Sequence, residues 1–113
     1  MRRIVLLIVV ALAAASPGTG NCGPVLNEVM ADPATDWNGD GTYDFKNDEW
    51  AEIYNPGPGA VDLANYYLGD EVGGFVYGFT GSLPAGGVKV VYGSQAVAWE
   101  SAHAQSTTGL RLG

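Results

Sequence analysis

The chain has 113 residues, of which 12 are acidic and 5 are basic, so its formal net charge is −7. This length allows one domain with a modest core and excludes a second domain. An acidic surface repels phosphate backbones, which argues against direct nucleic-acid binding.

The first residues have the pattern of an export signal. Arg2 and Arg3 precede an apolar run at residues 4–15 that ends in three alanines, as in a secretory signal with its cleavage site. The run is shorter than the roughly 20 apolar residues of a transmembrane helix, and nothing later could span a membrane. We expect residues 1–24 to be a signal peptide and linker, residues 25–113 to form the domain, and the protein to be extracellular or in the cell envelope.

Cys22 is the only cysteine, so no disulfide can form within the chain. Two interpretations of this residue stay open. Its position soon after the apolar run resembles a bacterial lipoprotein signal, in which the cysteine is acylated and becomes a lipid anchor. Cleavage after Ala15 would instead leave Cys22 in the linker as an incidental thiol.

Short apolar or alternating runs follow, separated by glycines and prolines, which is the pattern of strands and turns. We expect strands at residues 25–30, 50–55, 61–68, 75–79 and 88–92, and the start of another at 110–112. Residues 32–49 are polar and predict a long loop. Residues 95–103 fit either one or two helical turns or an irregular crossover.

Several short strands without long amphipathic helices predict an all-β fold, with an immunoglobulin-like antiparallel β-sandwich as the first choice. The disulfide-bonded immunoglobulin type is excluded, because it needs two cysteines. The strand that starts at residue 110 has no partner strand after it. We therefore expect the sandwich to lack its last strands and the chain to be truncated.

Residues 36–44 place acidic or amide side chains at alternate positions and turn at Asp40-Gly41, as in loops that wrap oxygen ligands around calcium. Asp48 or Glu49 would have to close such a site, because the usual closing position is Asn47. The predicted calcium ligands are Asp36, Asn38, Asp40, Thr42, Asp44 and Glu49. The alternative is a metal-free loop with Asx-turns at Asp36 and Asn38.

Other polar and aromatic residues give weaker signals. Glu28, Asp32 and Glu52 suggest paired carboxylates, but polar residues on the outward face of a strand are ordinary. His103, the only histidine, has no Ser-Asp pair at a recognisable spacing. The many aromatic residues raise the alternative of a carbohydrate-binding face; we expect most of them to pack in the core, and Trp37 and Tyr66 to be the pair that is exposed.

Six segments in a consistent order cover most of residues 25–112. They are LNEVMADP (26–33), NGDG (38–41), DEWAEIYNP (48–56), VDL (61–63), LGD (68–70) and LPAGG (83–87). Together they resemble the lamin tail domain family, which occurs in exported bacterial proteins and in nuclear intermediate filaments.

The resemblance implies an immunoglobulin-like β-sandwich that binds or tethers a protein or a cell-envelope component and has no catalytic activity. Two alternatives stay open. One is a calcium-dependent carbohydrate-binding module, and the other is a metal-dependent hydrolase or nuclease accessory domain.

Overall fold

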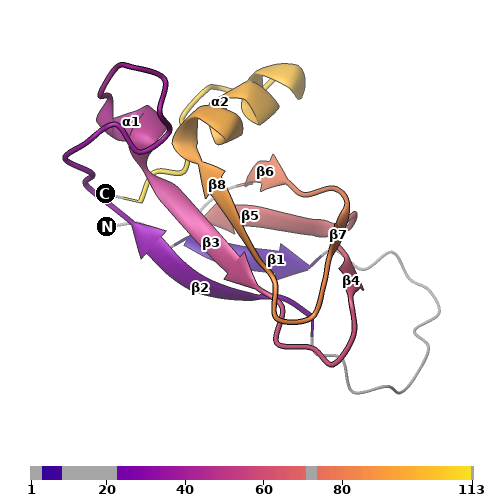
Figure 1. Ribbon diagram of the computed structural model, residues 1–113. Coiled ribbons are helices and arrows are strands. Elements are labelled where there is room, and N and C mark those ends of the chain that lie inside the picture. Colours follow the sequence, from indigo (N-terminus) through magenta and orange to yellow (C-terminus); the bar gives the residue numbers. More distant parts are fainter. Residues whose placement is uncertain (1–3, 9–22, 71–73, 113) are drawn as a thin grey trace.

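The computed structural model describes residues 4–8, 23–70 and 74–112, and over this part the chain consists mainly of short strands (Figure 1). The strands are β1 (Ile4–Ile8), β2 (Val25–Met30), β3 (Trp50–Tyr54), β4 (Val61–Asp62), β5 (Tyr66–Asp70), β6 (Phe75–Gly78), β7 (Ser82–Leu83) and β8 (Val88–Tyr92). The helices are α1 (Phe45–Asp48) and α2 (Gly93–Ala102).

The strands pair only antiparallel in the described residues. One sheet has the order β2–β3–β8 and a second the order β1–β5–β6, while β4 and β7 form a separate pair. Figure 1 shows the first sheet in front of the second, with α2 above them and the β4–β7 pair at the end away from α1. This arrangement confirms the predicted all-β, immunoglobulin-like fold.

The core lies between the two larger sheets and under α2. In β3, Ala51 and Ile53 are buried while their neighbours are partly exposed, because successive side chains of a strand point to opposite faces. The buried apolar residues are Ala51, Ile53, Leu63, Leu68, Val76, Phe79, Leu83, Val91, Ala96, Leu110 and Leu112. Both larger sheets, the β4–β7 region, α2 and the C-terminal segment therefore share one core.

Two predicted strands differ from the structure. The expected strand at residues 61–68 is split into β4 and β5, because Asp62 Oδ1 accepts the Ala64 N–H at 3.0 Å and bends the chain there. Residues 110–112 are not a strand. Leu110 and Leu112 are buried in the core, and Arg111 between them has φ of +56°, which is incompatible with an extended strand.

The short strand β7 was not predicted, and the two helices were missed or left open by the sequence. The polar loop at residues 32–49 contains the short helix α1, which has Asp44 as its N-cap. The open choice for residues 95–103 is settled in favour of a helix, α2, which begins at Gly93. A Cβ at Gly93 would collide with the Lys46 carbonyl oxygen, so a glycine is needed where α2 meets α1.

The N-terminal region is described only in part. Residues 4–8 of the predicted export signal form β1, which pairs with β5, and the rest of that signal lies outside the described residues. Signal cleavage stays a prediction. Over the described residues, neither helix is long and apolar enough to cross a membrane.

Candidate functional site

The acidic loop, defined here as residues 31–44 between β2 and α1, is closed by its own hydrogen bonds. The Asp36 carboxylate accepts the backbone N–H groups of Gly39, Asp40 and Gly41 at N···O distances of 3.0, 3.3 and 2.8 Å. Gly39 and Gly41 have φ of +73° and +91°, which glycine adopts without a steric penalty. A single carboxylate thus holds the turn at Asp40-Gly41.

Asn38 and Asp40 extend this hydrogen-bond network. Asp40 Oδ1 accepts the Thr42 N–H at 2.9 Å, and Asn38 Nδ2 donates to Asp40 Oδ2 and to Ser94 Oγ, both at 3.2 Å. Since Ser94 is in the first turn of α2, the loop is bonded to that helix as well as to itself. Asn38 Oδ1 also accepts the Asp40 N–H at 3.2 Å, which is an Asx-type bond of the kind that the metal-free alternative predicts at Asn38.

Asp44 and Asp48 fix the end of the loop. Asp44 Oδ1 caps α1 by accepting the N–H groups of Lys46 and Asn47 at 2.8 and 3.2 Å. Asp48 is fully buried, and its oxygens accept the N–H groups of Asn38 at 3.0 Å and Asp44 at 2.8 Å. The Asp44 amide is the main reason why the pKa of Asp48 lies below the ordinary aspartate value. Asp48 is therefore a buried anchor for the middle and the end of the loop.

Glu49, the residue predicted to close a calcium site, does not face the loop. Its buried carboxylate accepts the Leu112 N–H at 3.3 and 3.1 Å, whereas the adjacent Asp48 bonds the loop. The two side chains diverge because the backbone becomes extended at Glu49, at the end of α1. Nowhere in the described ranges do three or more Asp, Glu, His or Cys side chains gather in a way that would hold a metal ion. Calcium binding by the other loop residues stays a prediction.

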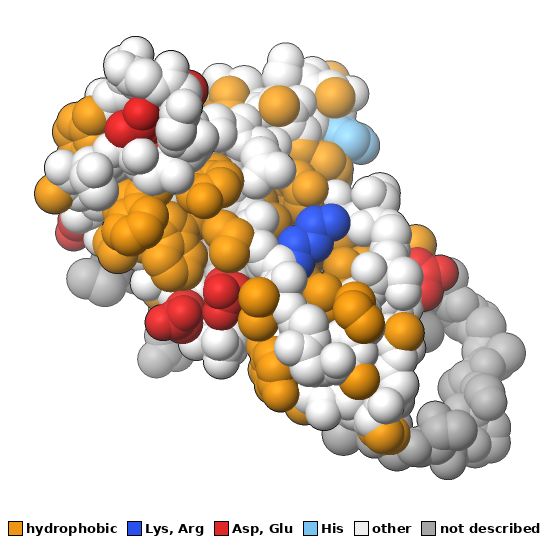
Figure 2. All heavy atoms as spheres, in the orientation of Figure 1, with side chains coloured by type: hydrophobic (Ala, Val, Ile, Leu, Met, Phe, Trp, Pro, Cys, Tyr) orange, Lys and Arg blue, Asp and Glu red, His pale blue; other side chains and the backbone are white. Residues whose placement is uncertain are grey.

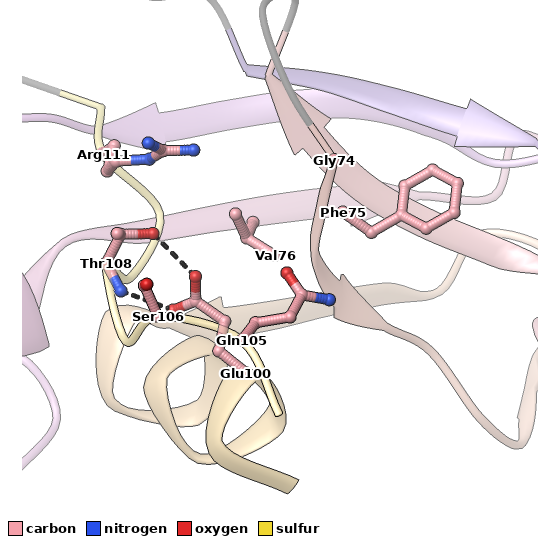
Figure 3. A pocket seen from close by; sticks show the side chains of 8 residues that line it. All are labelled: Gly74, Phe75, Val76, Glu100, Gln105, Ser106, Thr108 and Arg111. Carbon is pink, nitrogen blue, oxygen red and sulfur yellow. Dashed lines mark hydrogen bonds between the residues drawn. The ribbon is translucent and has the colours of Figure 1, made fainter. Parts of the chain in front are cut away.

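Glu100 holds the segment that follows α2. Its buried carboxylate accepts the Thr108 N–H at 2.9 Å, the Gly109 N–H at 2.7 Å and the Thr108 hydroxyl at 2.6 Å. Figure 3 shows the bonds between Glu100 and Thr108 at the edge of a cavity of about 330 Å³. The sequence carries no signal for this role, because the donors lie eight and nine residues away in an irregular segment.

The outer face of the β2–β3–β8 sheet combines carboxylates with apolar side chains. Glu28 and Glu52 are direct neighbours across β2 and β3, and Glu52 Oε1 accepts Asn27 Nδ2–H at 2.8 Å. Trp37 of the acidic loop packs edge-on against Trp50 of β3, with ring centroids 5.8 Å apart. Figure 2 shows hydrophobic side chains gathered over this side of the molecule, with acidic groups beside them.

The structure also places three residues singled out in the sequence, namely His103, Trp37 and Tyr66. His103 is exposed at the end of α2, stacks on Trp99 with ring centroids 4.0 Å apart, and bonds the Trp99 carbonyl oxygen through Nδ1 at 2.8 Å. Trp37 is 42% exposed, as expected. The prediction that Tyr66 is exposed with it is wrong, because Tyr66 begins β5 and packs against the core.

Cys22, the predicted lipidation site, lies outside the described residues, so its acylation stays a prediction.

Among the comparisons with known proteins, the search with family models found a match and the other two did not. Neither curated proteins nor solved structures matched the chain. The family model of the lamin tail domain matches residues 18–111, which includes the acidic loop, both helices and every described strand except β1. The chain therefore belongs to the lamin tail domain family.

Proposed function

We propose that the chain is an exported, non-catalytic module that binds a partner protein or a cell-envelope component and tethers it. Membership of the lamin tail domain family supports a binding or tethering role at a coarse level. Export is supported by the basic start and apolar run at residues 2–15. Lipid attachment through Cys22 is one way in which the module would be held at the envelope.

The observation that carries this proposal is the exposure of three aromatic side chains, Trp37, Tyr43 and Phe45, which we call the loop aromatics. They are 42%, 52% and 63% exposed, and they lie on the acidic loop and at the start of α1. Large aromatic side chains favour interfaces, because their apolar bodies gain from burial in a partner. The loop that carries them is already held in shape by hydrogen bonds, which lowers the entropy that binding must remove.

Co-sedimentation with cell-envelope fractions tests this proposal. The full chain is mixed with envelope fractions of the cells that produce it, and a Trp37→Ala/Phe45→Ala variant is compared with wild type. Removal of two aromatic contacts should lower the apparent affinity by about tenfold or more. The matched control is Ser101→Ala/Gln105→Ala, which changes two exposed polar residues near the end of α2. The proposal is contradicted if both variants sediment with the envelope fractions to the same extent as wild type.

Calcium binding by the acidic loop remains a prediction within this proposal. Alternate oxygen-bearing side chains at residues 36–44 support it, and affinities of extracellular calcium modules lie at about 10⁻⁴ to 10⁻³ M. Calorimetric titration should then give heat with wild type and much less with Asp36→Ala and Asp40→Ala, whereas Asp62→Ala, outside the loop, should match wild type. The absence of both heat and thermal stabilisation in millimolar calcium would remove calcium from the proposal.

A carbohydrate-binding role is the second candidate, and a specific aromatic hollow favours it. No observation on the described residues favours the metal-dependent hydrolase or nuclease alternative.

A further inference from the structure

A hollow of about 540 Å³ opens between α2, β5 and β6, on residues other than the loop aromatics. Its lining includes Tyr67, Phe75, Phe79, Thr80, Trp99 and His103. The volume lies within the range of small-molecule sites, which are concave, mostly apolar and lined by aromatic residues with a few polar groups. The hollow therefore has the size and the composition of a ligand site.

Three of the aromatic rings in its wall, those of Tyr67, Phe75 and Trp99, contact one another in a fixed arrangement. Tyr67 is stacked on Phe75 with ring centroids 4.4 Å apart and an interplanar angle of 18°. Tyr67 also meets Trp99 edge-on, with centroids 6.4 Å apart and an angle of 72°. These contacts orient the rings before any ligand arrives, which reduces the cost of binding.

Gly78 of β6 lets two of these rings lie close to the strand. A Cβ at this position would lie 3.0 Å from Trp99 Nε1 and 3.0 Å from Tyr67 Cε1, which is closer than ordinary van der Waals contact. Any larger residue would push Tyr67 or Trp99 out of its present position. The shape of the hollow thus depends on the absence of a side chain at Gly78.

Two polar side chains line the hollow. His103 donates Nδ1–H to the Trp99 carbonyl oxygen, which leaves Nε2 for a hydrogen bond with a ligand. Thr80 adds an exposed hydroxyl that both donates and accepts. None of the described residues that line the hollow is Asp, Glu, Lys or Arg, although the whole chain carries a net charge of −7. This chemistry suits a neutral ligand rather than an ionic one.

We propose that this hollow binds a neutral saccharide. A sugar ring has C–H groups on its faces, which are attracted to the electron-rich faces of aromatic rings, and hydroxyl groups around its edge. One face of Trp99 is covered by the His103 ring and one face of Tyr67 by Phe75, so a sugar ring would pack against the aromatic surface of the wall that these contacts leave open. His103 and the Thr80 hydroxyl would bond the sugar hydroxyls. Binding does not require calcium, since none of the lining residues belongs to the acidic loop.

Titration with neutral oligosaccharides tests the site. The full chain is titrated with cellohexaose, chitohexaose, xylohexaose and mannohexaose by calorimetry, and the tryptophan indole N–H signals are followed by NMR, with and without chelator. At least one oligosaccharide should bind, shift the Trp99 signal and be insensitive to the chelator. Trp99→Ala should weaken this binding by about tenfold or more, while Trp37→Ala should leave it unchanged.

A second variant keeps the test decisive. His103 is exposed, so His103→Ala should fold normally and still weaken binding several-fold; it decides the question if Trp99→Ala does not fold. The inference is overturned if none of the four oligosaccharides binds, if both single variants bind like wild type, or if the hollow binds tetramethylammonium in place of sugars. It fails separately from the proposed tethering role, because the hollow and the loop aromatics share no residue.

Discussion

The acidic loop and the segment after α2 are both irregular, and carboxylates that accept backbone N–H groups hold both of them. In the loop, Asp36 is partly exposed and bonds residues three to five positions away. In the C-terminal segment, Glu100 and Glu49 are buried, and Glu49 reaches Leu112, 63 residues along the chain. Local bonds give the loop a shape of its own, whereas the C-terminal segment is part of the core. The loop is therefore free to present side chains to a partner.

The largest expected effect is at Glu100. Glu100→Ala would leave three donors without their acceptor: the Gly109 N–H, which is buried, and the Thr108 N–H and hydroxyl, which are partly buried. Each unsatisfied buried donor costs about 1–3 kcal/mol, so we expect the free energy of unfolding to fall by about 3–5 kcal/mol. Urea denaturation measures this change, with exposed Glu28→Ala as a control that should stay within about 0.5 kcal/mol of wild type. A loss at Glu100 no larger than the control's would mean that this carboxylate does not hold the segment.

Asp48 should give the loop a dependence on pH. The Asp44 amide holds the pKa of Asp48 below the ordinary aspartate value, which is about 3.9. The ionised Asp48 side chain therefore stabilises the folded state at pH values above that ordinary pKa. The contribution is lost as the pH falls through the lower pKa of the folded state. Unfolding measured between neutral pH and pH of about 2 should show a smaller acid-induced loss for Asp48→Asn than for wild type. Identical pH profiles would contradict this role.

Asp36→Ala tests the hydrogen bonds within the loop, and its effect should be smaller than that of Glu100→Ala. The donors that it frees lie in an exposed region where water replaces the carboxylate, so we expect a loss of only about 1 kcal/mol. Thermal or urea unfolding measures it, and Thr35→Ala at an exposed position of the same loop is the control. A loss as large as that at Glu100 would show that the loop is as integral to the core as the C-terminal segment.

Phe45→Ala should have the smallest effect on stability. The side chain is 63% exposed, so its removal should change the free energy of unfolding by no more than about 0.5 kcal/mol. Urea denaturation checks this value. A loss of more than about 1.5 kcal/mol would place Phe45 in the core of the folded protein and remove it from the proposed binding surface.

Regular strands were predictable from the sequence where alternation and turn residues agree. The predicted strand at residues 88–92 has the bounds of β8, since turn-forming glycines precede it and Gly93 follows it. The strand predicted at 61–68 was wrong because a turn divides it, in which Asp62 Oδ1 accepts the Ala64 N–H and the Leu63 carbonyl oxygen accepts the Tyr66 N–H. The bond at Asp62 is local, but the prediction gave more weight to the apolar residues of this segment than to the turn-forming Asp62 and Asn65.

The candidate site was predictable only in its local part. Asx-type bonds at Asp36 and Asn38 were among the alternatives, because their donors lie within a few residues. The sequence could not tell which of the adjacent Asp48 and Glu49 faces the loop, since this depends on where α1 ends and β3 begins. It also did not predict the hollow, because Tyr67 and Trp99 are 32 residues apart and meet only after α2 packs on β6.

Site-specific photocrosslinking tests most directly whether the acidic loop is the side that meets a partner. A photoreactive phenylalanine analogue is placed at Phe45 in the full chain, or at Ala98, an exposed position on α2, and cells producing each variant are irradiated. The account predicts a specific adduct with one envelope or protein partner at Phe45, reduced by Trp37→Ala, and little or none at Ala98. Adducts of equal yield at the two positions, or an adduct only at Ala98, would contradict it.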